Sequence, residues 1–234
     1  MSFLLVHGAF RGAWAWGEVP DALRARGHRV ESPSLIGMGE LTPPPGRRGV
    51  VTLADWVRQL SELARMADLA DIVLVGHSQG GMVARAAAAP LGDRLAAIAY
   101  LDSHMPREGQ RGVELSGPTA GRTLPPADAW LDPTPVRAAG GYGEYLAAFI
   151  NDRAGPTPVG PSLDPMPNPE PSVPRHVAFC DLTPPGFPST LARAAMDEAG
   201  EGYVLFESPH DAALAEPAMV VGWLASIAEP TSMG

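Results

Sequence analysis

The sequence predicts an α/β fold, in which one mostly parallel sheet carries helices on both faces. Two observations predict it. Strand patterns alternate with helix patterns before residue 105, and the alternation returns after residue 175. Between these stretches, 14 of the 26 prolines fall within residues 106–174, where apolar residues are too sparse for a separate core. We therefore expect one α/β core, residues 1–105 and 175–234, interrupted by an inserted proline-rich cap, residues 106–174, called the cap segment below.

The first part of the core alternates strands and helices in order. Each strand is a short apolar run ended by a turn signal, which is typical of a buried parallel strand. Each helix has apolar residues at helical spacing, and Thr52 is an expected N-cap. The expected elements are strand Phe3–Val6, helix Val19–Arg26, strand His28–Ser32, helix Leu53–Asp68, strand Asp71–Val75, helix Gly80–Ala89 and strand Leu95–Leu101.

The second part of the chain continues the pattern after the cap segment. Within that segment only Tyr142–Asn151 has a clear helical pattern. The expected elements that follow are strand His176–Cys180, helix Thr190–Ala199, strand Tyr203–Glu207 and helix Ala218–Ala228.

The composition excludes several classes of function. All 17 basic residues are Arg, against 26 acidic residues, and the net charge is −9. A chain this acidic, with scattered arginines, is not expected to bind nucleic acid. The absence of Lys excludes a Schiff-base lysine, a P-loop lysine and a Ser–Lys dyad. Arginine without lysine, with much Ala, Gly and Pro, also suggests a GC-rich, bacterial genome.

Cysteine usage and hydropathy predict a cytoplasmic protein. Cys180 is the single cysteine, so no internal disulfide can form. No Cys/His cluster has the spacing of a metal site, and we expect neither a metal nor a cofactor. The apolar opening residues run straight into His7 and indicate a strand, not a signal peptide. No apolar run approaches the roughly 18–20 residues of a membrane helix, so no membrane partner is expected. The oligomeric state stays open.

The segment Gly76–Gly80 carries the strongest functional signal. It reads Gly-His-Ser-Gln-Gly and lies between a buried strand and a helix of small residues. A serine at such a sharp turn is held in a strained backbone conformation, with its hydroxyl exposed above the sheet, and the flanking glycines let strand and helix approach. The turn also places Ser78 at a helix N-terminus, where backbone N–H groups can stabilise an oxyanion. We expect Ser78 to be a nucleophile.

A second oxyanion donor is expected from the His-Gly turn after the first strand, so the predicted pair is the backbone N–H groups of Ala9 and Gln79. His7 itself is expected to be a buried structural histidine. The base should follow the last strand, where His210 stands. His77 is expected to point the wrong way out of the turn, whereas His104 follows a strand end and could line the substrate pocket.

The segments 3–16, 76–81 and 208–211 resemble the α/β-hydrolase superfamily, and within it the branch of plant methylesterases, hydroxynitrile lyases and small bacterial carboxylesterases. The resemblance implies the α/β-hydrolase fold and covers most of the chain, least so the cap segment. It implies that Trp130 lines the acyl pocket, and Phe10 joins it and His104 as an expected pocket residue. It also implies an acid after the strand that follows the cap segment, a position that falls on Thr183.

Two aspartates compete for the role of the triad acid, which holds the histidine tautomer and stabilises the imidazolium. Asp181 lies two residues before the position implied by the methylesterase branch. Asp102 ends the strand after the nucleophile's helix, where a haloalkane dehalogenase group with a similar stretch places its acid. We expect Asp102, with Asp181 as second choice. Asp211 is expected to cap the next segment.

Three functions are compatible with these residues. The first is a serine hydrolase that cleaves an ester, thioester or lactone through an acyl-enzyme on Ser78. The second is a biosynthetic cyclase or intramolecular acyl transferase acting on a natural-product intermediate. The third is a ligand-binding protein without turnover. A cyanohydrin lyase is rejected because Asp211 stands where that lyase has lysine, and a dehalogenase is disfavoured because its nucleophile is an aspartate. In each reading the partner is a small molecule, an acyl substrate for the first two.

Overall fold

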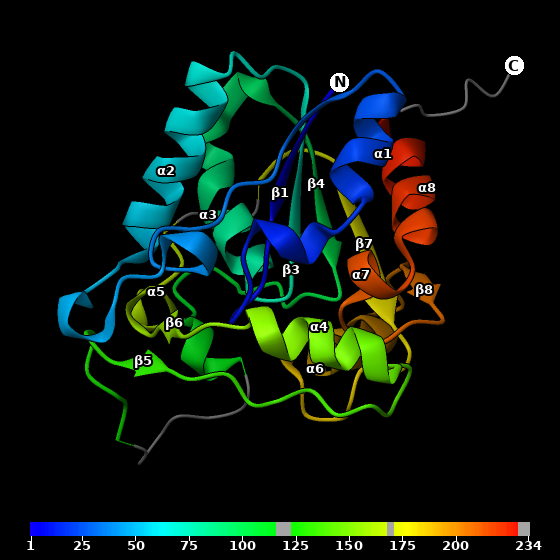
Figure 1. The fold of residues 1–234 in the computed structure, drawn as a ribbon. Coiled ribbons are helices and arrows are strands. Elements are labelled where there is room, and N and C mark those ends of the chain that lie inside the picture. The colour runs from blue at the N-terminus through cyan, green and yellow to red at the C-terminus, as the bar shows by residue number, and fades with distance from the viewer. Residues whose placement is uncertain (116–122, 168–170, 229–234) are drawn as a thin grey trace, which may run out of the picture.

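A six-stranded parallel sheet runs through the centre of the molecule, in the order β2-β1-β3-β4-β7-β8 (Figure 1). The computed structural model describes residues 1–115, 123–167 and 171–228. The strands are β1 (Ser2–Val6), β2 (Arg29–Glu31), β3 (Ile72–His77), β4 (Leu95–Leu101), β7 (Arg175–Cys180) and β8 (Val204–Phe206).

The strands are apolar on both faces because helices cover both faces. Leu4 and Leu74 belong to one buried cluster, whereas Phe3 and Val73 belong to a second cluster on the opposite face. This alternation follows from the two-residue period of a strand and explains why β1 is buried along its whole length. The sheet therefore separates two cores and forms a rigid base for the loops at its carboxyl edge.

The helices divide between these two cores. The first core receives α2 (Leu53–Met66), α3 (Gly80–Leu91) and α6 (Pro188–Ala199); the second receives α1 (Val19–Ala25), α7 (Ala212–Ala215) and α8 (Pro217–Ala228). Thr52 caps α2 as expected, because its hydroxyl accepts a hydrogen bond from the backbone N–H of Asp55. Short 3₁₀ helices are η1 (Ala13–Trp16), η2 (Gly39–Leu41), η3 (Pro45–Arg47), η4 (Gly92–Arg94) and η5 (Gly112–Glu114).

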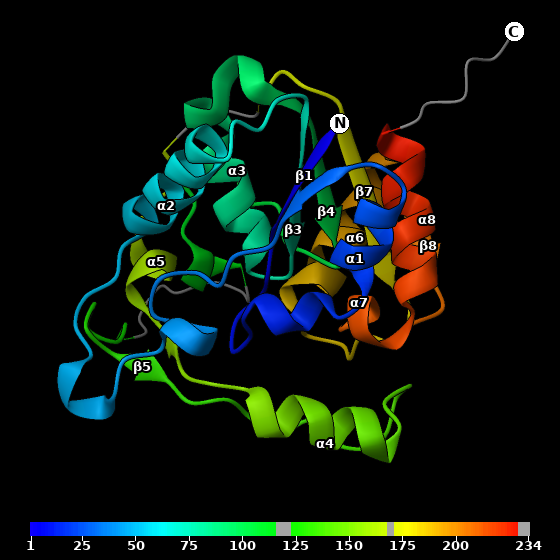
Figure 2. The same ribbon diagram turned by 45° about the horizontal axis from the view of Figure 1, so that its top comes forward.

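The described part of the cap segment lies beyond the carboxyl ends of the strands (Figures 1 and 2). The expected helix is present as α4 (Glu144–Arg153). The segment also contains β5 (Trp130–Leu131), β6 (Thr157–Pro158) and α5 (Gly160–Leu163). The sequence did not predict these elements because strands of two residues and a helix of four carry no readable periodicity. The division of the chain into core and cap stays a prediction.

In the ranges that the structure describes, no helix is both long enough and apolar enough to cross a membrane.

Candidate active site

Ser78 lies at the sharp turn between β3 and α3, with a backbone φ of +53°. This conformation is uncommon for a residue with a side chain, and the surroundings hold it in place. The Ser78 N–H donates to the carbonyl of Leu101 at 3.2 Å, and the Ser103 hydroxyl donates to the carbonyl of Ser78 at 2.7 Å. The end of β4 and the residues after it therefore fix the turn.

Glycines surround Ser78 because the backbone packs too closely for a side chain. A Cβ on Gly80 would lie 2.3 Å from the Val6 carbonyl oxygen, and one on Gly76 would lie 2.5 Å from the Cα of Gly81. A Cβ on Gly8 would lie 2.8 Å from the Cβ of Ser78. The loop after β1 therefore passes directly against the serine, which places the neighbouring Ala9 at the same site.

The two N–H groups expected to stabilise an oxyanion form no hydrogen bonds with the described parts of the chain. These are the backbone N–H groups of Ala9 and Gln79, which line the same cavity as Ser78. Two hydroxyls of the cap segment contact the adjoining groups. The Thr157 hydroxyl accepts the Phe10 N–H at 2.6 Å, and the Ser162 hydroxyl accepts from the Gln79 side chain at 2.9 Å. The cap segment therefore hydrogen-bonds both of the loops that carry these N–H groups.

The structure brings Asp102, and not Asp181, to His210. Nδ1 of His210 lies 2.5 Å from Oδ2 of Asp102, so Nε2 is the ring nitrogen left for a reaction. Asp181 instead accepts the Ser208 N–H at 3.1 Å. Thr183, where the family resemblance implied the acid, donates its hydroxyl to Oδ2 of Asp102 at 2.5 Å. Thr183, at the position that the resemblance implied for the acid, thus hydrogen-bonds Asp102 at the end of β4.

Asp102 is buried and ionised. Burial favours its neutral form, but the hydrogen bonds from His210, Thr183 and the Cys180 N–H outweigh burial and hold the pKa of Asp102 below its ordinary value. An ionised carboxylate here fixes the histidine tautomer and can stabilise the imidazolium that forms when His210 takes a proton.

His77 does not point away from the site, contrary to the expectation from the turn. It lines the cavity, its ring centroid lies 4.7 Å from that of His210, and its Nε2 donates to the His210 carbonyl oxygen at 2.9 Å. Burial and the nearby His210 lower the pKa of His77 to about 4. Uncharged His77 therefore supports the backbone of the loop that carries His210.

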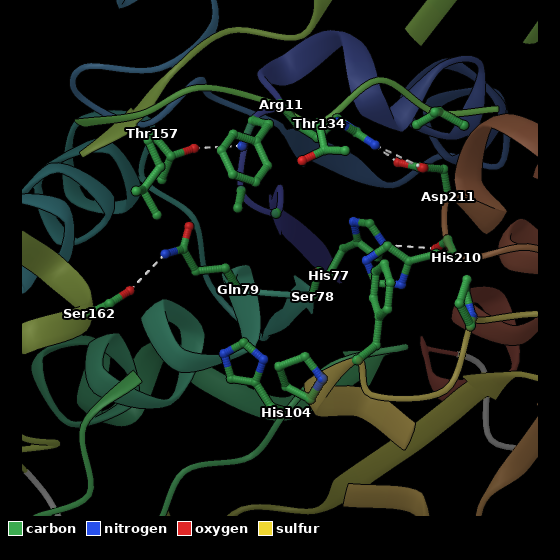
Figure 3. Close-up of a pocket in the computed structure, with 18 of the residues that line it drawn as sticks. Arg11, His77, Ser78, Gln79, His104, Thr134, Thr157, Ser162, His210 and Asp211 are labelled. Atoms are coloured by element: carbon green, nitrogen blue, oxygen red, sulfur yellow. Dashed lines mark hydrogen bonds and ion pairs between the residues drawn. The ribbon is translucent and has the colours of Figure 1, made fainter. Parts of the chain in front are cut away.

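These residues line a cavity of about 940 Å³ between the sheet edge and the cap segment (Figure 3). Most of its wall is apolar. Phe10 and His104 line it. Trp130 does not, which corrects the expectation: its indole N–H donates to the Gly49 carbonyl at 3.2 Å, and the next residue, Leu131, lines the cavity instead.

A buried ion pair in the cavity wall was missed by the sequence analysis. Both oxygens of Asp211 accept from Arg11, at 2.8 and 3.0 Å, and the hydroxyl of Tyr142 donates to the same carboxylate at 2.8 Å. Asp211 stands at the N-cap of α7 but forms no side-chain cap, so that expectation was wrong. Burial alone would raise the pKa of Asp211, but the Arg11 charge outweighs it and lowers the pKa. The sequence signal that could have indicated this pair was Arg11, in the loop after His7 and Gly8, together with Asp211 next to His210.

Among the described residues, no three or more His, Cys, Asp or Glu side chains are grouped so that they could hold a metal ion.

Comparison with known proteins identifies similar chains. The model of a family described as "Alpha/beta hydrolase family" matches residues 3–223. The chain is 37% identical to the carbendazim hydrolyzing esterase of Nocardioides sp. over 108 residues, 46% of this chain and 44% of that protein. It is 33% identical to salicylic acid-binding protein 2 of Nicotiana tabacum over 131 residues, 56% of this chain and 49% of that protein. These matches span about half the length of the curated relatives.

A solved structure matches over the whole chain. It is a pyrethroid hydrolase from Sphingobium faniae JZ-2, with a TM-score of 0.80 and 21% identity, covering 100% of this chain and 99% of that one. At this identity the likeness shows the α/β-hydrolase fold, as predicted from the sequence.

Proposed function

We propose, from the premise that the chain belongs to the alpha/beta hydrolase family, that it is a serine hydrolase cleaving carboxylic esters, thioesters or lactones. One observation carries the proposal. Ser78, on its strained turn, shares a cavity with His210, whose Nδ1 is held by the buried Asp102. Relatives named as esterases support the same class of reaction.

The reaction begins with the transfer of the Ser78 hydroxyl proton to Nε2 of His210 as the oxygen attacks the ester carbonyl. The N–H groups of Ala9 and Gln79 donate to the oxyanion of the tetrahedral intermediate. His210 then returns its proton to the leaving alcohol as the carbon–oxygen bond breaks, which leaves an acyl-enzyme. Water, deprotonated by His210, attacks the acyl carbon and releases the acid and Ser78.

Cyclisation is the second candidate. In that reaction a hydroxyl of the acyl group, rather than water, attacks the acyl-enzyme and releases a lactone. The size of the cavity favours cyclisation. Its volume of about 940 Å³ is at the upper end for small-molecule sites, so a long acyl chain can fold back within it. Mass spectrometry separates the two, because hydrolysis adds water to the acyl product and cyclisation does not.

The first experiment is covalent labelling with a fluorophosphonate, read by intact mass. We expect one adduct on the wild type and none on Ser78→Ala. The matched control is Ser226→Ala, which changes a serine on α8 whose hydroxyl donates to the Trp223 carbonyl, remote from the cavity; it should label normally. Hydrolysis of p-nitrophenyl esters by the same three proteins completes the test. An adduct or turnover that survives in Ser78→Ala would refute the assignment.

A further inference from the structure

His104 presents an imidazole to the floor of the cavity. It follows β4 by three residues, and the intervening pair serves other contacts: Asp102 holds His210, and Ser103 holds the Ser78 carbonyl. The His104 carbonyl oxygen lies 3.0 Å from the same Ser103 hydroxyl oxygen, which keeps the backbone of His104 beside the Ser78 turn. Figure 3 shows the ring directed into the cavity, below Gln79. The position of the ring is therefore fixed by the segment that also fixes the nucleophile.

The imidazole of His104 has no hydrogen-bond partner within the described residues, although the residue is only 8% exposed. Two other polar side chains of the same lining are paired with protein groups. Gln79 is matched by Ser162, and Asp211 by Arg11 and Tyr142. Because His104 lines the cavity and its ring is not paired with protein, the ring is open to a hydrogen bond from a molecule in the cavity.

The ring of His104 is uncharged at neutral pH. Burial, together with the nearby His210, lowers the pKa of His104 to about 4. A neutral imidazole offers one N–H donor and one bare nitrogen acceptor. A hydroxyl group can accept from the N–H or donate to the bare nitrogen, and a carbonyl can accept from the N–H, whereas a carboxylate meets no positive charge on this ring. The floor is thus built for an uncharged polar group in an otherwise apolar ligand.

We propose that His104 is a specificity-determining residue that hydrogen-bonds a hydroxyl or carbonyl group of the substrate, so that the preferred substrates are largely apolar esters carrying such a group near the ester. This rests on the proposed function and names its substrate class.

The test compares three probes that differ by one hydroxyl: methyl 3-phenylpropanoate and its 2-hydroxy and 3-hydroxy derivatives. The wild type should favour at least one hydroxy ester by about tenfold or more in kcat/KM. His104→Phe should lose that preference, so that the ratio of kcat/KM on each hydroxy ester to kcat/KM on the plain ester falls to about one. His104→Asn places an amide near the position of Nδ1, and His104→Gln places one near the position of Nε2. One of these two variants should keep part of the preference for the hydroxy ester that His104→Phe loses. Thr134→Val, a polar-to-apolar change elsewhere in the lining, is the matched control and should keep it.

The outcomes separate this proposal from the proposed function. No hydroxyl preference in the wild type, or an equal loss on all three esters in His104→Phe, would overturn the role of His104 and leave ester hydrolysis standing. If no ester is hydrolysed, the binding of the same probes to Ser78→Ala, measured by calorimetry, still decides. A hydroxyl preference in Kd that disappears when His104→Phe is added supports the site, and its absence overturns it. Circular dichroism checks that each variant is folded.

Discussion

Replacing Asp102 with asparagine should disable His210 as the proposed base. Both carboxylate oxygens of Asp102 accept hydrogen bonds: Oδ1 from the Cys180 N–H, and Oδ2 from Thr183 and His210. An asparagine has one acceptor oxygen, so in either orientation its NH₂ faces a group that now donates. If the oxygen stays on Cys180, the NH₂ meets Nδ1 of His210 and favours the tautomer protonated on Nε2. That tautomer cannot take the proton of Ser78.

The expected loss is large. A wrong tautomer in a serine–histidine–aspartate triad costs about 10⁴ in kcat, a value measured in another hydrolase, which is about 5.4 kcal/mol at 1.36 kcal/mol per tenfold. Asp181→Asn is the matched control, because its side-chain oxygen can still accept the Ser208 N–H. It should change kcat/KM by less than about threefold.

The assay is kcat/KM on a p-nitrophenyl ester together with the rate of fluorophosphonate labelling. Both should fall in Asp102→Asn and stay near the wild-type value in Asp181→Asn, with unchanged circular dichroism in each. A loss in Asp181→Asn that equals or exceeds the loss in Asp102→Asn would refute the assignment of the acid to β4.

Three further changes probe the site. Gly8→Ala should reduce kcat/KM at least a hundredfold, because its Cβ would lie 2.8 Å from that of Ser78, whereas Gly46→Ala, with no atom within 4 Å, should be neutral. Arg11→Met should lower the free energy of unfolding, measured in urea, by about 3–5 kcal/mol, because the Asp211 side chain is only 1% exposed and would keep a buried unpaired charge. Adding Asp211→Asn should recover part of that free energy, and additive losses would contradict the pairing. The unfolded state binds a proton at His104 below pH 6.5, whereas the folded state binds it only below about pH 4. The free energy of unfolding should therefore fall by about 3 kcal/mol for this residue as the pH drops through this window. His104→Gln should flatten this decline in urea titrations at several pH values, and an unchanged slope would contradict the role of His104 in it.

The core and the turn at Ser78 could be predicted from the sequence because each depends on a local pattern. A buried strand, a glycine-flanked serine and a helix of small residues predict one turn geometry, and the structure has it at Ser78. The aspartate at the end of β4 was a candidate because β4 was expected beside β3, and the two strands do pair. The catalytic roles of these residues stay predictions.

The errors had two origins: the register of a short strand, and a contact between residues far apart in the chain. Trp130 and Leu131 are adjacent on β5, so their side chains point to opposite faces, and a resemblance without a defined register cannot choose between them. Asp211 was expected to make a local cap, but its partner Arg11 is 200 residues away. No local pattern contains such a contact.

The hydroxyls of Thr157 and Ser162 limit how this fold can be re-engineered. Since each binds a loop that carries a proposed donor to the oxyanion, exchanging the whole cap segment for that of a relative would alter the surroundings of Ser78 along with the pocket. A grafted cap should retain catalysis only if it brings acceptors to the same two places. Changes of substrate range are better sought one side chain at a time, at wall positions such as Leu131, Val136 and Phe187.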